Sequence, residues 1–134
     1  YGCDDCQSSC PHTIKWSVPV HVNTSHRQSL SALFLLNASD DELMNECDGW
    51  YVHDRNPVWV RRNALIIIGN TAKSTDLDAH DVVARYINSS EPILRAHAVW
   101  AAARLGLTHL MPSTDSDEMV RAELAHLPAL RGDL

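Results

Sequence analysis

The sequence has no long apolar run and no segment that resembles a secretion signal. Its longest uninterrupted aliphatic stretch, Ala64 to Ile68, covers only five residues, whereas a membrane-spanning helix needs about 20. The amino-terminal residues are polar and rich in cysteine, where a signal peptide would carry an apolar core. We therefore expect a cytoplasmic protein that has no membrane segment and acts as a monomer.

Positive charge is also scarce. The 134 residues carry 11 Lys and Arg against 17 Asp and Glu, which gives a formal net charge of −6. This balance argues against a surface that coats nucleic acid through positive charge all over. A local basic patch is not excluded, since Arg55, Arg61, Arg62 and Lys73 fall within one short stretch. They fit a solvated helix face and a set of phosphate contacts equally well.

Cysteine is rare outside the first ten residues. Three of the four cysteines, Cys3, Cys6 and Cys10, are spaced C-x2-C-x3-C, and Pro11 follows directly. Bacterial ferredoxins carry the run C-x2-C-x2-C-x3-C-P, whose last cysteine binds the other of two clusters. The loop therefore predicts iron–sulfur ligands, with Cys3 and Cys6 on one cluster and Cys10 on a second. The first cysteine of such a run would precede Tyr1, so we expect a segment upstream.

The spacing of the loop also fits other kinds of cysteine site. A zinc site remains open, because His12 supplies a fourth ligand beside the three thiolates. A disulfide framework suits three clustered cysteines poorly, and a thioredoxin-type Cys-x-x-Cys would need a preceding strand. The distant Cys47 is expected to be a buried or half-buried thiol near a helix end.

The rest of the chain predicts an all-α protein. Residues 12–25 are rich in β-branched residues and interrupted by Pro19, which indicates an extended connector. Apolar residues then recur at helical spacing between capping residues. The expected helix starts are Ser29 or Ser31, Ser39 with Glu42 in a capping box, Asn56-Pro57, Thr75 or Asp76, Glu91-Pro92 and about Ser116. The expected helix ends include Asp48-Gly49, Gly69-Asn70 and Gly106, and the expected inward residues include Val60, Ala64, Ile67, Ile68, Leu94, Ala98, Ala101, Ala102, Leu105, Met119, Val120, Leu124 and Leu127.

An internal repeat lies within these helices. The segments 60–65 and 94–99 align 34 positions apart, and each follows an Xaa-Pro helix start. A helical repeat of this period is typical of solenoids. The fold class we predict is a HEAT-like α-solenoid over residues 26–134, preceded by the end of a ferredoxin-like iron–sulfur segment and its connector over residues 1–25.

The eight histidines are scattered and show no metal-ligand spacing. Metal-binding and catalytic histidines occur in groups, so most of these are expected to be ordinary surface or half-buried residues. His97, three residues before Trp100 on a predicted helix, is expected to be packed against its neighbours.

Together these features resemble the epoxyqueuosine reductase family. The loop from Gly2 to Pro11 is similar to its second cluster motif, and the segment 60–70 resembles its HEAT-like helix. The segments 94–101 and 117–123 resemble its carboxyl-terminal part. The resemblance covers essentially the whole chain but only the carboxyl-terminal part of the family's usual length.

The resemblance implies a cobalamin-dependent reductase with two 4Fe–4S clusters that reduces epoxyqueuosine in tRNA to queuosine. By position, Cys3, Cys6 and Cys10 would be cluster ligands, and Asp4 and Asp5 would lie against the corrinoid. The helical repeat would hold the tRNA anticodon arm. Arg61, Arg62 and Lys73 would contact phosphates, on the grounds of charge and location. The electron donor is not implied.

The chain also departs from the family. His12-Thr13 stand where the family commonly has Trp-Asn, and the cobalamin domain, the proton donor and the first cluster motif are absent from these residues. We therefore expect the chain to be inactive alone. A non-catalytic HEAT-like binding module and an electron-transfer accessory remain alternatives, the loop then being vestigial or zinc-binding.

Overall fold

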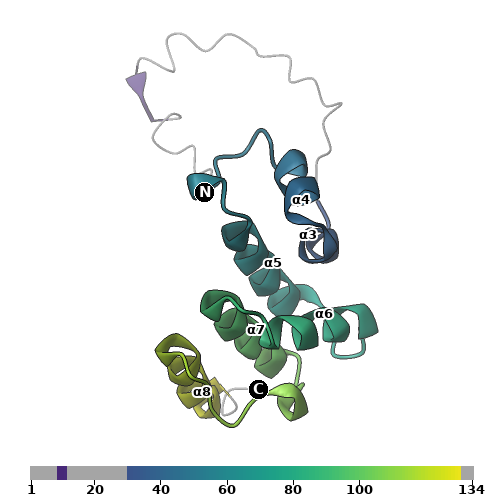
Figure 1. The fold of residues 1–134 in the computed structure, drawn as a ribbon, viewed down its shortest axis with the longest axis vertical. Coiled ribbons are helices and arrows are strands. Elements are labelled where there is room, and N and C mark those ends of the chain that lie inside the picture. The colour runs from purple at the N-terminus through teal and green to yellow at the C-terminus, as the bar shows by residue number, and fades with distance from the viewer. Residues whose placement is uncertain (1–8, 12–29, 131–134) are drawn as a thin grey trace.

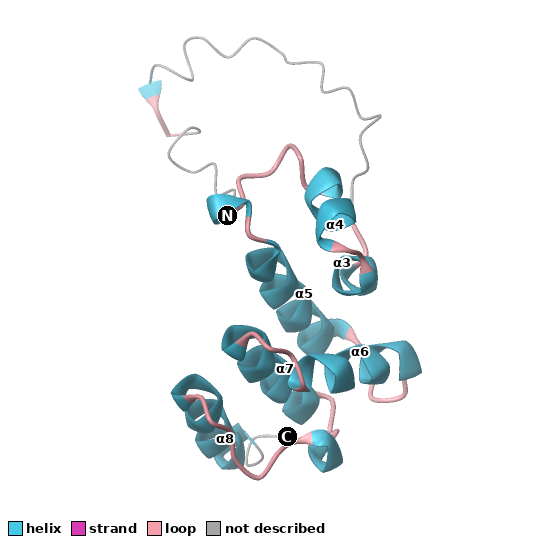
Figure 2. Ribbon diagram, viewed as in Figure 1, coloured by secondary structure: helices cyan, strands magenta, loops and turns pink. Residues whose placement is uncertain are grey.

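The computed structural model describes residues 9–11 and 30–130, and this part of the chain is all-helical (Figures 1 and 2). Its α-helices are α3 (Ala32–Asn37), α4 (Asp40–Glu46), α5 (Pro57–Thr71), α6 (Leu77–Ile87), α7 (Pro92–Arg104) and α8 (Glu118–Leu130). Two 3-10 turns, η1 (His53–Arg55) and η2 (Thr108–Leu110), lie in the connections. The predicted all-α class is confirmed for these residues, whereas the connector over 12–25 lies outside them.

Local capping explains where the helices begin. The Ser31 side chain caps α3, and Ser39 with Glu42 forms the predicted capping box at the start of α4. Asn56 caps α5 with Pro57 at its first position, and the Asp76 carboxylate accepts from the backbone N–H of Ala79 in α6. Each cap satisfies an N–H group that the helix itself leaves unpaired. The predicted helix starts are confirmed here to within two residues.

Helix α7 is the centre of the packing. It lies against α5, α6 and α8, and α3 packs on α5 and α6. Figure 1 shows α5, α7 and α8 following one another along the long axis of the view, with α6 beside them. The buried face of α7 includes the small residues Ala98, Ala101 and Ala102, as predicted. Small side chains let neighbouring helices approach closely, so α7 is in contact on several sides.

The carboxyl end of α5 differs from the prediction. The helix continues through Gly69 and Asn70 to Thr71. Gly69 is not a cap: a Cβ atom there would lie 2.5 Å from Cζ3 of Trp100 and 3.1 Å from Cα of Ala101. The glycine is needed because α7 passes directly over it. Gly106, with φ of 75°, does end its helix as expected.

Three residues predicted to lie on the apolar faces of their helices are exposed instead, one of them Phe34 on α3. Ile67 lies on the solvent side of α5, and Met119 is exposed on α8. The other inward residues named above are buried or half-buried. No helix in the described ranges is long and apolar enough to cross a membrane.

Candidate nucleic-acid interface

Most of the predicted cluster loop lies outside the described residues. Cys3, Asp4, Asp5, Cys6 and His12 belong to the ranges 1–8 and 12–29. Cys10 is described and is partly exposed. Among residues 9–11 and 30–130 there is no group of three metal-ligating side chains. The cluster and corrinoid assignments therefore stay predictions.

Cys47 is confirmed as a buried thiol at the carboxyl end of α4. Burial and the neighbouring Glu46 carboxylate raise the pKa of this thiol, and Arg55 lowers it by a smaller amount. A raised pKa keeps the sulfur protonated at neutral pH, and the thiolate is the form that reacts and binds metal. Cys47 is therefore a buried, protonated residue of the core.

Arg61, the first of the predicted phosphate contacts, already has partners within the protein. Its guanidinium forms an ion pair with Asp40 at the start of α4 and donates to the backbone carbonyl of Ala38 at 2.9 Å. Only 15% of its side chain is exposed. The contacts tie α5 to the α3–α4 corner. They favour a structural role for Arg61.

Arg62 lies beside Arg61 but faces another direction. Its guanidinium carbon lies 5.7 Å from the centre of the Trp59 ring, and it donates to the side-chain oxygen of Asn63. Neither contact neutralises its charge. Arg62 is therefore a cation that a phosphate group can still use.

Lys73 and Arg55 complete the basic stretch. Lys73 is exposed between α5 and α6 and makes no ion pair with the described residues. Arg55 lies 3.7 Å from Asp48 and donates to the Met44 carbonyl. Arg55 lies before α5 and Lys73 after it, so the 15-residue helix separates them and the four cations do not form one cluster.

A groove crosses α5, α7 and α8 on one side of the row that these three helices form. It has a volume of about 250 Å³. Its lining residues are Ile66 from α5, Ala96, His97 and Trp100 from α7, and Met119 and Glu123 from α8. The prediction treated His97 and Trp100 only as packing residues. The groove depends on three helices, so helical periodicity within one of them does not reveal it.

Two tryptophan–arginine pairs lie on this side of the molecule. The Arg104 guanidinium carbon is 6.0 Å from the centre of the Trp100 ring. Trp59 and Arg62 precede the groove residue Ile66 by seven and four positions, so all three share one side of α5. Trp59 and Arg62 are three positions apart, and Arg62 and Ile66 are four positions apart. These spacings are visible in the sequence and are the signal from which this side of α5 could be predicted. We call Trp59, Arg62, Trp100, Arg104 and the groove the aromatic–arginine face.

The acidic residues are concentrated elsewhere. Four exposed carboxylates lie on α4, namely Asp40, Asp41, Glu42 and Glu46. A second hollow, between α3 and α6, is lined by Asp78 and Asp81 together with Arg85. Glu123 is the one carboxylate among the residues that line the groove. The aromatic–arginine face is thus less acidic than the net charge of the chain suggests.

Comparison of the chain with protein-family models, with curated proteins and with solved structures finds no match.

Proposed function

We propose that this chain is the carboxyl-terminal part of an iron–sulfur protein of the epoxyqueuosine reductase type, with a HEAT-like domain that binds tRNA. The observation that carries the proposal is the loop of Cys3, Cys6, Cys10 and Pro11, followed by a domain of packed helices. Cysteine thiolates are the ligands of iron–sulfur clusters, and the spacing is that of a two-cluster ferredoxin segment.

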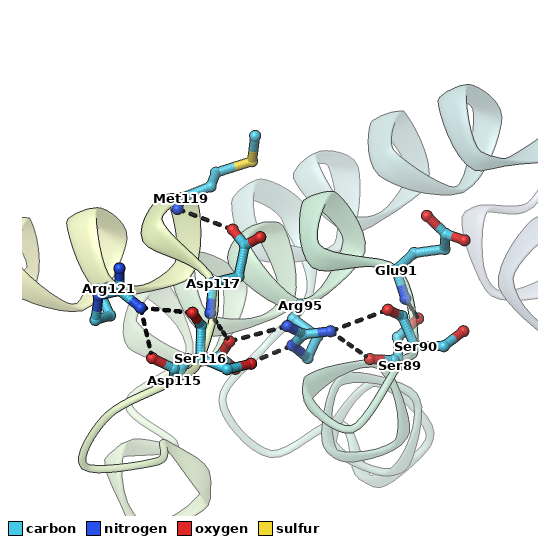
Figure 3. Close-up of polar contacts among 9 residues, drawn as sticks. All are labelled: Ser89, Ser90, Glu91, Arg95, Asp115, Ser116, Asp117, Met119 and Arg121. Atoms are coloured by element: carbon cyan, nitrogen blue, oxygen red, sulfur yellow. Dashed lines mark hydrogen bonds and ion pairs between the residues drawn. The ribbon is translucent and has the colours of Figure 1, made fainter.

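The repeat assignment has support beyond sequence. Arg61 and Arg95 occupy equivalent positions of the two aligned segments. Each binds an aspartate from a neighbouring segment, Asp40 for Arg61 and Asp115 for Arg95 (Figure 3 shows the second). Each also donates to backbone carbonyl groups. Equivalent residues with equivalent contacts are expected of a structural repeat, which favours the HEAT-like interpretation.

The residues of this chain would have distinct roles in such a protein. Cys3 and Cys6 would hold one cluster and Cys10 the second, while Asp4 and Asp5 would lie against the corrinoid. The clusters supply electrons for reduction of the epoxide. The helical domain supplies the tRNA contacts.

Iron content tests the cluster assignment. After anaerobic reconstitution of the full-length protein, we expect bound iron and sulfide and a brown colour. Replacing Cys6 or Cys10 with serine is expected to remove a large share of the iron, because each position supplies a thiolate. Cys47→Ser is the matched control and is expected to leave the iron content unchanged. Zinc without iron would instead support a non-catalytic binding module with a zinc-binding loop.

A charge reversal tests the tRNA contact. We expect Arg62→Glu to weaken binding of tRNA about tenfold and to reduce the salt slope by about one, because one phosphate contact is lost. Affinity is measured by fluorescence anisotropy over a range of salt concentrations. Arg61→Glu is expected to lower the thermal midpoint instead, because it places a carboxylate against Asp40. Unchanged affinity and salt slope in Arg62→Glu would remove α5 from the binding surface.

A further inference from the structure

The groove of the aromatic–arginine face offers a particular set of hydrogen-bonding groups. His97 Nδ1 lies 2.7 Å from the backbone carbonyl oxygen of Ile93. A carbonyl oxygen only accepts, so Nδ1 must donate the proton there. In a neutral imidazole the remaining nitrogen, Nε2, is then an acceptor. Glu123, when ionised, is also an acceptor. His97 Nε2 and the Glu123 carboxylate therefore both accept, so they suit a ligand that presents N–H donors to them.

The other lining residues restrict the shape of that ligand. Ile66, Ala96 and Met119 provide apolar surface, and Trp100 provides an aromatic ring. The volume of about 250 Å³ is below the range typical of sites for drug-sized molecules. A single planar ring system suits these dimensions better than a whole nucleotide. An aromatic side chain favours a planar ligand because the two stack.

We propose that the groove binds one unpaired guanine-type base of an RNA loop. The N1–H and 2-amino groups of guanine lie side by side and match the two oxygens of the Glu123 carboxylate. Unstacked bases in RNA loops are recognised in this way, by stacking on aromatic side chains and hydrogen bonds to the Watson–Crick edge. Trp100 supplies the stacking surface, and the flanking phosphate meets Arg104. This inference rests on the proposed tRNA-binding role of the helical domain.

A protein partner is the competing occupant. The guanidinium group of an arginine side chain is also planar and rich in N–H donors. Two cations of this protein, Arg62 and Arg104, lie on the same face. They repel a basic peptide and attract the phosphates on either side of a base. The charge of the face therefore favours RNA.

Paired RNA hairpins test the proposal on the chain as it stands. One hairpin carries a single guanine in its loop, and the other carries inosine, which lacks the 2-amino group. We expect the inosine hairpin to bind about tenfold more weakly, as one partner of a bidentate contact is lost. Glu123→Gln is expected to weaken the guanine hairpin by a similar factor and to leave the inosine hairpin almost unchanged. Glu118→Gln, in the first turn of α8 and outside the groove lining, is the control.

The outcomes separate this inference from the function on which it rests. Equal affinity for both hairpins, or equal behaviour of the Glu123→Gln and Glu118→Gln variants, overturns the guanine site while leaving the tRNA role in place. Failure to bind either hairpin overturns both the site and the tRNA role, and the iron measurement then decides the cluster assignment alone. Binding of an arginine-rich peptide that is lost in Glu123→Gln, without discrimination between the hairpins, overturns the site in favour of a protein partner.

Discussion

Replacing Gly69 with valine is expected to lower the free energy of unfolding by about 3 kcal/mol, at the upper end of the cost of overpacking a core. The Cβ atom alone would approach Cζ3 of Trp100 to 2.5 Å and Cα of Ala101 to 3.1 Å. The tryptophan ring can move, but the Ala101 backbone belongs to the central helix α7. The two helices α5 and α7 must therefore separate. Chemical denaturation, followed by circular dichroism, measures the loss.

Other glycine substitutions provide the comparison. Gly69→Ala is expected to cost less, because alanine gains about 1 kcal/mol of helix propensity over glycine. Gly49→Ala is the control, as a Cβ atom there meets nothing within 4 Å. We expect it to change stability by less than about 0.5 kcal/mol. If Gly69→Val were as stable as Gly49→Ala, the close contact of α5 with α7 would be wrong.

The helix starts could be predicted from the sequence because they depend on neighbouring residues. The Ser39–Glu42 box spans three positions, and Asn56 caps the helix that Pro57 opens. The role of Gly69 could not be predicted in the same way. Its neighbour Trp100 is far away in the chain, and a glycine near the end of an apolar stripe has the same local pattern as a cap. The requirement for glycine at position 69 therefore comes from a tertiary contact and not from the local sequence.

The candidate site also contains some features that local sequence predicts and others that depend on tertiary contacts. Arg61 and Arg62 are adjacent and chemically identical, but only Arg61 is held by Asp40. That partner lies 21 positions away, so sequence alone assigns both arginines to the same role. Glu123 could not be assigned at all, because the groove exists only where α8 meets α7 and α5. The helices that form this surface are predictable from local sequence patterns, whereas the side chains that stay available on it depend on contacts between distant segments.

The contact between α7 and α8 is expected to weaken sharply in acid, because it depends on the ionised Asp115. Arg95 donates from Nε and Nη2 to the two oxygens of this carboxylate, at 3.0 and 2.9 Å (Figure 3). Only 14% and 13% of the two side chains are exposed. Arg95 also donates to the carbonyl groups of Ser89 and Ser90, and so joins the start of α7 to the segment before α8.

The pKa of Asp115 sets the pH range of this effect. The hydrogen bonds from Arg95, followed by the one from the backbone N–H of Asp117, lower this pKa from 3.8 to about 2. Well above pH 3.8 the carboxylate is ionised in both the folded and the unfolded state, and the pair contributes fully to stability. Between that pH and about 2, the unfolded chain binds a proton that the folded chain does not, so stability falls. Unfolding near pH 3 should take up about 0.8 of a proton through this group.

Substitution at either residue isolates the contribution. In Asp115→Asn, we expect lower stability at neutral pH and a shallower dependence of the unfolding free energy on pH between about 4 and 2. Arg95→Met should flatten the same range, because without the guanidinium the main cause of the lowered pKa of Asp115 is removed. Asp41→Asn removes an exposed carboxylate that has no ion pair among the described residues, and serves as the control.

Hydrogen exchange at neutral pH should show α8 losing protection before α5 in both Arg95→Met and Asp115→Asn. Two results would contradict the view that the Arg95–Asp115 pair holds α7 against α8. One is a pH profile that stays equally steep in Asp115→Asn, and the other is a uniform loss of protection across all helices.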